Sequence, residues 1–143
     1  MFSESVKHAI QAMIYLASNN NQLVMVNQIA EEYDIPKYYL AKLVQTLVKH
    51  HLIKSVQGRN GGIRLNKPST KIKIIDIIHA IEGPSPEKEM CIFGLDECSD
   101  FVPCPIHPEW KKMKLELNDK ILNRNLNNLN KELMKKHLML QNS

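Results

Sequence analysis

The sequence predicts a mainly α-helical fold with a small β-hairpin wing, in which a winged helix-turn-helix is followed by a long C-terminal dimerisation helix. Three observations indicate this fold class. Apolar residues recur every three or four positions in several segments, a glycine-rich hairpin pattern follows the third segment, and leucines recur every seven residues near the C-terminus. With 143 residues, the chain has room for one compact domain and an appended element.

The first half has the element order of a winged helix-turn-helix. Helices are expected at about 4–18, 27–33 and 36–50, because the apolar side chains of each segment share one face. Pro36 suits the first turn of the third helix, where its missing N–H costs nothing. The strand 52–56, the turn 57–62 and the strand 63–65 then form the wing, since Asn60 and Gly61 favour the positive φ values of tight hairpins.

The second half is expected to contain a helix, a functional loop and another helix. Residues 71–82 form the first of these, which Gly83 and Pro84 end. A loop of about 25 residues without apolar periodicity follows. From Pro108 to about Leu140 we predict one long helix, with leucines at 115, 122 and 129 and at 126, 133 and 140. This helix either packs back onto the domain or, as its length favours, joins two chains in a homodimer.

Basic residues are concentrated in the first half of the chain. Residues 1–83 hold 10 basic and 6 acidic side chains, which account for the whole net charge of +4, while residues 84–143 hold nine of each. No acidic residue occurs between Ile35 and Ile75. Such a stretch suits a polyanion, although a merely solvated basic face would have the same composition. Its coincidence with the helix-turn-helix favours double-stranded DNA as the partner.

The third predicted helix would lie in the major groove of DNA. Its outward face presents Tyr38, Lys42 and Gln45, which are the candidates for reading base edges. Tyr39 and Thr46 lie at the margins of this face and would equally bond phosphates.

The wing would add contacts to the phosphates or the minor groove through Arg59 and Arg64. For Lys49, Lys54 and Lys67, an ordinary solvated lysine is an equally good interpretation. The predicted DNA-contacting residues are Lys37, Tyr38, Tyr39, Lys42, Gln45, Thr46, Lys49, Arg59 and Arg64.

Three cysteines and a histidine lie within 17 residues of the predicted loop: Cys91, Cys98, Cys104 and His107. No apolar run is long enough for a membrane span and no secretory segment is evident, so we expect a cytoplasmic protein with reduced thiols. Three thiolates and an imidazole are competent to bind zinc or an iron–sulfur cluster. The spacing is not that of paired C-x-x-C motifs, which disfavours zinc without excluding it. His107 could instead cap the next helix or be solvated.

Together these motifs resemble the IscR/NsrR-type iron–sulfur winged-helix transcription regulators of bacteria, the Rrf-two family. The resemblance covers nearly the whole chain, through residues 12–17, Tyr38-Tyr39-Leu40, the wing 55–62 and the segment 104–110. It implies a winged-helix homodimer, joined through a long helix, that binds palindromic promoter DNA. It also implies a [2Fe-2S] or [4Fe-4S] cluster whose state changes DNA affinity with iron, redox or nitric oxide status.

The resemblance assigns Cys91, Cys98 and Cys104 as cluster ligands. His107 matches the histidine that completes the IscR-type [2Fe-2S] site, which favours a [2Fe-2S] cluster. The predicted domains are then residues 1–83 for the winged helix-turn-helix DNA-binding domain, 84–107 for the cysteine-containing cluster-binding loop, and 108–143 for the dimerisation helix and tail.

The first helix bears on the fourth ligand as well. In the nitric oxide sensors of this family, that ligand resembles an aspartate in the first helix of the partner subunit. Lys7 occupies the matching position here and cannot bind a metal while protonated. Glu4 and His8 are the alternatives nearby.

The sequence supports a repressor whose promoter affinity is switched by an iron–sulfur cluster, and it leaves two other functions open. A zinc-stabilised or ligand-responsive winged-helix regulator would keep the same DNA-binding half. A small iron–sulfur redox carrier would use the cysteines but would not need the basic stretch. Enzymatic activity is not expected, because no acid–base pair, nucleophile triad or phosphate-binding glycine loop occurs at a recognisable spacing.

Overall fold

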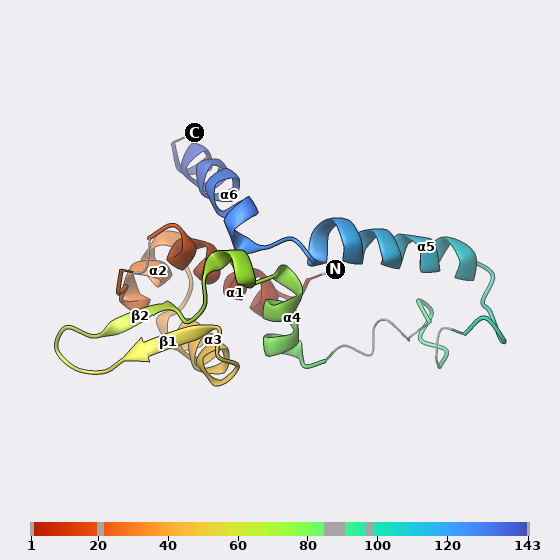
Figure 1. Cartoon of the computed structure of the whole chain (residues 1–143), viewed down its shortest axis with the longest axis horizontal. Helices are drawn as coiled ribbons and strands as arrows, with labels where there is room; N and C mark the ends of the chain where they lie inside the picture. The colour runs from red at the N-terminus through yellow and green to blue at the C-terminus, as the bar shows by residue number, and fades with distance from the viewer. Residues whose placement is uncertain (1, 20–21, 85–90, 97–98, 143) are drawn as a thin grey trace.

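The computed structural model describes residues 2–19, 22–84, 91–96 and 99–142. Within these ranges it contains six α-helices and a two-stranded antiparallel hairpin, which confirms the predicted fold class (Figure 1). The elements are α1 (Glu4–Ala17), α2 (Val26–Tyr33), α3 (Lys37–Lys49), β1 (Ile53–Val56), β2 (Gly62–Leu65), the 3-10 turn η1 (Ser69–Lys71), α4 (Ile74–Glu82), α5 (His107–Leu117), the π-helical turn η3 (Asn118–Leu122) and α6 (Leu126–Gln141).

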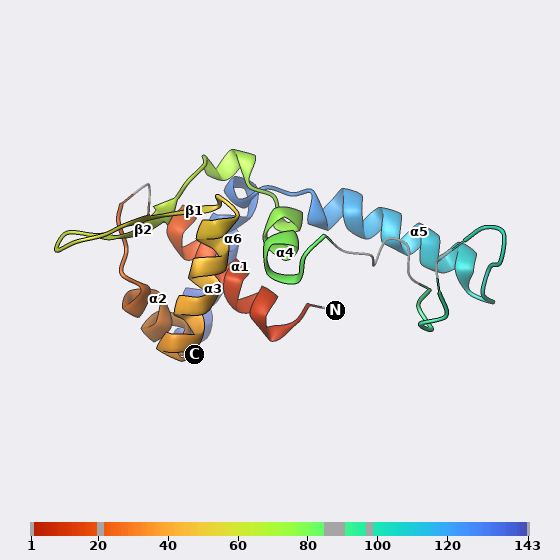
Figure 2. The ribbon, with the colours of Figure 1, turned by 90° about the horizontal axis from the view of Figure 1, so that it is seen from below.

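The core of the winged helix is built around α1, which contacts α3, α4, α6 and β2. Its inward face is fully apolar, and Ala9, Met13 and Leu16 are at most 2% exposed. Leu40 and Leu47 of α3 are completely buried against it. Figure 2 shows α1 and α3 side by side, with the hairpin extending away from them. This packing leaves the polar face of α3 in solvent.

The wing forms as predicted, but a different residue makes its turn. Val56 and Gly62 close the antiparallel pair. The left-handed residue of the turn is Gly58, with φ 105°, and neither Asn60 nor Gly61 has a positive φ. Gly61 is needed for another reason, since a Cβ there would overlap the carbonyl oxygen of Val56. The expectation that Asn60-Gly61 supplies the positive φ values was therefore wrong.

The turn between α2 and α3 places α3 on the core. Asp34 ends α2 in the left-handed conformation, with φ 53°, which lets the backbone N–H of Ile35 bond the carbonyl of Ala30 at 2.9 Å. Ile35 is 4% exposed and anchors the turn. Pro36 precedes the first residue of α3, as its lack of an N–H favours.

The helix predicted from Pro108 to Leu140 is in fact two helices. The chain breaks after η3, and the side chain of Asn125 caps α6 by accepting a bond from the N–H of Asn128 at 3.0 Å. The segment between the two helices is also hydrogen-bonded to the winged helix, since the N–H of Leu126 donates to the carbonyl of Ile72 at 2.9 Å. A continuous leucine seam from 115 to 140 therefore does not exist, because asparagines favour helix caps over helix interiors.

The two C-terminal helices have different surroundings. Helix α6 packs back on α1, with Leu126 1% exposed, so the packing-back alternative holds for this part. Helix α5 extends away from the winged helix in both views (Figures 1 and 2), whereas η3 at its end contacts α4. Met113, Leu115 and Ile121 on this arm are between 45% and 59% exposed. The long helix that extends from the domain is thus residues 107–122.

Candidate nucleic-acid interface and cysteine loop

The outward face of α3 carries the predicted base-reading residues. Tyr38 is 85% exposed, and the side chains of Lys42 and Gln45 are also exposed. Lys37 and Lys49 lie in solvent at the two ends of the helix. These side chains share one surface because Leu40, Leu43, Val44 and Leu47 take up the opposite face.

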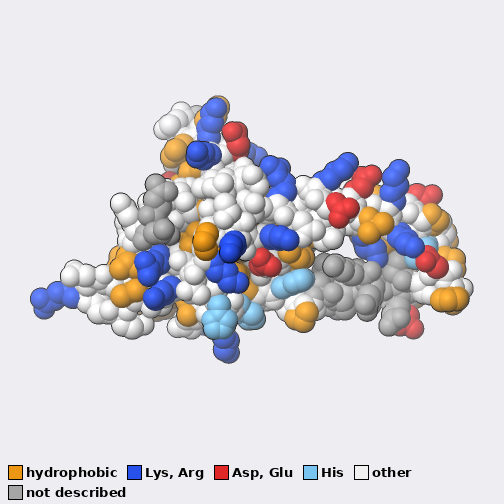
Figure 3. Space-filling view, viewed as in Figure 1, with side chains coloured by type: hydrophobic (Ala, Val, Ile, Leu, Met, Phe, Trp, Pro, Cys, Tyr) orange, Lys and Arg blue, Asp and Glu red, His pale blue; other side chains and the backbone are white. Residues whose placement is uncertain are grey.

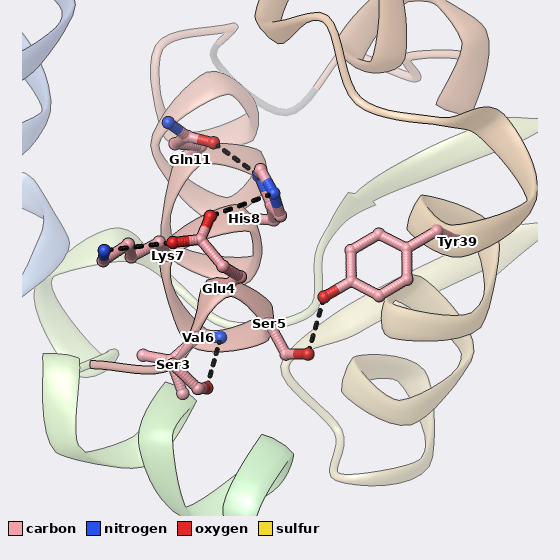
Figure 4. A network of polar contacts seen from close by, with 8 residues as sticks. All are labelled: Ser3, Glu4, Ser5, Val6, Lys7, His8, Gln11 and Tyr39. Atoms are coloured by element: carbon pink, nitrogen blue, oxygen red, sulfur yellow. Dashed lines mark hydrogen bonds and ion pairs between the residues drawn. The ribbon is translucent and has the colours of Figure 1, made fainter.

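Two residues at the margin of this face have partners within the chain. The hydroxyl of Tyr39 lies 2.6 Å from Ser5 Oγ, and its ring meets the edge of the His8 ring with centroids 5.7 Å apart (Figure 4). The hydroxyl of Thr46 donates to the carbonyl of Lys42 at 3.2 Å within the helix. In the free chain, Tyr39 therefore links the start of α1 to α3 rather than facing solvent.

The wing extends the basic surface. Arg59 is exposed at its turn and Arg64 is half-buried on β2. Figure 3 shows Lys and Arg side chains at the tip of the hairpin and over its strands. Since no acidic residue occurs between Ile35 and Ile75, the exposed face of α3 and the wing carry basic side chains and no acidic ones. The described geometry brings the predicted DNA-contacting residues onto two adjacent elements, α3 and the hairpin.

The start of α1 holds a small polar network (Figure 4). Lys7 Nζ bonds Glu4 Oε1 at 3.1 Å, and His8 Nε2 lies 3.8 Å from the other oxygen of Glu4. His8 Nδ1 lies 3.1 Å from Gln11 Oε1. The residues considered as a fourth ligand from the first helix are thus engaged with one another within one chain.

The cysteine loop brings Cys91 and Cys104 together, and Cys98 lies outside the described residues. Cys91 is 9% exposed, and Cys104 is half-buried. The backbone N–H of Phe93 is the main group that lowers the pKa of the Cys91 thiol, helped by the N–H of Leu95, the thiol of Cys104 and the charge of Lys114, while burial opposes the shift. Backbone N–H groups directed at sulfur favour a thiolate, which is the form that binds metals.

His107 begins α5 as a buried residue. Its side chain is 7% exposed, and Nε2 lies 2.7 Å from Asp100 Oδ1. Lys111 Nζ bonds the other oxygen of Asp100 at 3.0 Å. The hydrogen bond with His107, and then Lys111, lowers the pKa of the Asp100 carboxyl. The alternative of a solvated His107 is therefore wrong, and a carboxylate partner is the usual arrangement for a metal-binding histidine.

Trp110 is one helical turn beyond His107, and the sequence alone did not indicate a role for it. Its indole Nε1 is buried and has no hydrogen-bond partner among the described residues. Lys114 Nζ lies 5.9 Å from the centre of the ring. Asp100 was also missed, because a carboxylate that orients a histidine from seven residues away has no spacing rule.

The donor set suits a sulfur-bound metal centre. Among the described residues no three His, Cys, Asp or Glu side chains are grouped as a metal site, and the third cysteine of the loop lies outside them. The thiolate-favouring backbone around Cys91, the neighbouring Cys104 thiol and the orphaned N–H of Trp110 fit a centre that offers sulfur acceptors. Separately, no helix in the described ranges is long and apolar enough to cross a membrane.

Comparisons with known proteins agree with this architecture. The model of the Rrf2 family, described as an iron-dependent transcriptional regulator, matches residues 2–132. A protein of Aquifex aeolicus named among the HTH-type transcriptional regulators is 39% identical over 121 residues, which are 83% of this chain and 83% of the relative. The HTH-type transcriptional regulator NsrR of Bacillus licheniformis is 36% identical over 92 residues, or 64% of this chain and 59% of the relative.

Solved structures share the fold along most of the chain. CymR (YrzC), the global cysteine regulator of B. subtilis, has a TM-score of 0.77 at 22% identity and covers 92% of this chain and 97% of its own. IscR of T. potens has a TM-score of 0.70 at 26% identity, covering 93% of this chain and 88% of its own.

Proposed function

Because this chain belongs to the Rrf2 family of iron-dependent transcriptional regulators, we propose that it is a repressor whose affinity for promoter DNA is switched by an iron–sulfur cluster. The cluster would be held by Cys91, Cys98 and Cys104, with His107 as fourth ligand. Members of this family are regulators rather than enzymes, and the redox carrier considered above has no support from the relatives.

One observation carries the cluster assignment. The buried Cys91 thiol receives backbone N–H groups and lies beside Cys104, so the loop already favours a thiolate at the place where a metal would bind. His107 is oriented by its hydrogen bond with Asp100 of the same loop. A bound iron–sulfur cluster would supply a centre that changes charge and stability with redox and iron status.

The DNA-binding step uses the chain's own residues. Helix α3 would enter the major groove, where Tyr38, Lys42 and Gln45 reach base edges. Arg59 and Arg64 would contact phosphates or the minor groove from the wing. Two copies joined through α5 would place their recognition helices in successive major grooves of a palindrome, about 34 Å apart.

The switch requires a connection between the loop and the arm. His107 is both the first residue of α5 and the partner of Asp100 in the loop, so a change in the loop acts on the base of the arm. If α5 joins two copies, reorienting it alters the spacing of the two α3 helices. Coupling of this kind typically changes affinity by about 1–3 kcal/mol, or roughly 5- to 150-fold.

The test is DNA binding by cluster-loaded and metal-free protein. DNA sites are first selected from random duplexes with the cluster-loaded wild type. The affinity for these sites is then measured for four proteins: the loaded wild type, the metal-free wild type, Cys91→Ala and Cys104→Ala. We expect the two variants to bind as the metal-free wild type does and to differ at least fivefold from the loaded form. Equal affinities for all four proteins would exclude a cluster-dependent switch. Ser99→Ala in the same loop is the matched control and should respond as the wild type does.

A further inference from the structure

The side chain of Trp110 has an unmet hydrogen-bonding group. Its indole Nε1 is the only buried side-chain nitrogen or oxygen without a partner in the part of the chain that the structure describes. Buried polar groups are almost always hydrogen-bonded, because an unpaired one loses its water contacts without compensation. An indole N–H can only donate, so the missing partner must be an acceptor.

The position of Trp110 on α5 indicates where this acceptor lies. His107, Trp110, Lys111 and Lys114 follow one another at helical spacing and share one face of α5. This face is the one that meets the cysteine loop, since Asp100 bonds both His107 and Lys111. In Figures 1 and 2, α5 lies away from the winged helix, and Lys114 on this face lies 5.9 Å from the centre of the Trp110 ring and acts through its charge on the Cys91 thiol.

We propose that the indole N–H of Trp110 donates a hydrogen bond to a sulfur atom of the cluster held by Cys91 and Cys104, and thereby raises its reduction potential and slows its loss. The role rests on the proposed function, because it needs a sulfur-containing centre in the loop. Sulfide and thiolate sulfurs accept N–H bonds, and the number of such bonds is one of the determinants of cluster potential. Trp110 would act as a positioning and tuning residue, since the ligands themselves are the thiolates.

The chemistry gives the direction of the effect. Reduction adds negative charge to the sulfurs, so an N–H donor stabilises the reduced state more than the oxidised one. Removal of the donor should therefore shift the potential to more negative values. Removal should also leave a sulfur exposed to attack, because partners around a metal site commonly change metal retention by about 10- to 100-fold.

The experiment compares the wild type with Trp110→Phe, which keeps an apolar ring and loses only the donor and the second ring. Both proteins are loaded with cluster without oxygen, and the potential is measured by redox titration in the visible range. The rate of cluster loss to a chelator is then measured for each. Tyr15→Phe is the matched control, since it also removes one polar group from an aromatic side chain but lies on α1, outside the cysteine loop and α5.

We expect Trp110→Phe to have a more negative potential and to lose its cluster about tenfold faster, with Tyr15→Phe unchanged. The metal-free variant should melt close to the metal-free wild type, because in that form the N–H has no partner to lose. Equal potentials and equal loss rates in loaded proteins would overturn the role of Trp110 alone. A wild type that takes up neither iron nor sulfide would overturn the cluster and this role together.

The chain offers a second readout in the wild type itself. Trp110 is its single tryptophan, so fluorescence excited at wavelengths that only tryptophan absorbs reports on this position alone. We expect the emission to be quenched on cluster loading and to recover as the chelator removes iron. Unchanged emission on loading would place the indole away from the cluster and contradict the hydrogen bond.

Discussion

His107 Nε2 lies 2.7 Å from Asp100 Oδ1, and this contact joins the cysteine loop to the first residue of α5. The imidazole is buried, whereas the Asp100 side chain is 68% exposed and also bonds Lys111. The carboxylate therefore fixes the ring from the solvent side. The same residue pair links the candidate metal site to the arm through which we expect two copies to associate.

Loss of the Asp100 carboxylate should weaken metal retention. Asp100→Asn removes the charged partner that orients His107, and we expect about tenfold faster loss of iron to a chelator with little change in folding. Asp96→Asn is the control, because it removes a loop carboxylate that bonds neither His107 nor Lys111 in the structure. Identical loss rates for Asp100→Asn and the wild type would exclude His107 as a ligand that Asp100 positions.

Substitutions on α3 and on the wing should have different effects on DNA binding. Gln45→Ala should lower affinity by about 1–3 kcal/mol and relax the preference at one base pair of the site. Arg59→Ala should weaken binding to all DNA sequences. It should also reduce the salt dependence of the affinity by the amount expected for the loss of about one phosphate contact. Both are measured by anisotropy titrations at several salt concentrations, with Lys120→Ala on the arm as control. A Gln45 variant with unchanged preference would show that α3 reads bases through other side chains.

Tyr33 should ionise late in an alkaline titration. Burial, followed by the charge of Glu32, raises the pKa of Tyr33 from 10.0 to about 12. The neutral phenol is favoured in the folded protein, so this contribution to stability is complete below pH 10 and is lost as the pH rises through about 12. The free energy of unfolding of the wild type should therefore fall relative to that of Tyr33→Phe over this range. Absorbance of the phenolate should show one late tyrosine in the wild type and none in the variant.

The same tyrosine belongs to the contact between α2 and α6. Its ring stacks on His137 with centroids 4.3 Å apart, and its hydroxyl donates to Met134 Sδ at 3.6 Å. Tyr33→Phe keeps the stacked ring, so any loss of stability at pH 7 should stay within about 1 kcal/mol. A larger loss would indicate that the hydroxyl has a further role.

Leu126 should be important for stability although it lies beyond the winged helix. It is 1% exposed at the start of α6, and its N–H bonds Ile72. Leu126→Ala should lower the free energy of unfolding by about 2–5 kcal/mol, as measured by denaturant titration. Leu115→Ala on α5, where the leucine is 57% exposed, is the control and should change monomer stability little. Equal small effects would contradict the packing of α6 on the core.

Local sequence patterns were sufficient for the first half of the fold. Helices α1 to α3 and the strands of the hairpin lie within about two residues of their predicted bounds, because periodicity and turn residues act over short distances, whereas α4 begins at Ile74 rather than at residue 71. The C-terminal half was harder to predict, since the sequence is equally compatible with Asn125 at an exposed position on a long helix. Its role as a cap depends on backbone pairing with the segment before α4, which is far away in the sequence.

The sequence indicated candidate ligands for the site, and it gave no indication of their surroundings. The spacing of Cys91, Cys104 and His107 indicated a metal site without any structure. The Ser5–Tyr39 bond spans 34 residues, and the unpaired N–H of Trp110 depends on how the loop covers α5. No local sequence pattern predicts either relationship, so both are evident only in the structure.

The central claim is that the cysteine loop holds an iron–sulfur cluster. The most direct measurement is the iron and acid-labile sulfide content of protein purified without oxygen, together with its visible absorption. We predict a coloured protein with about equal amounts of iron and sulfide, and a colourless Cys91→Ala variant. A colourless wild type with one zinc per chain, or one that cannot be loaded with any metal, would contradict the claim and leave a winged-helix regulator with a different signal.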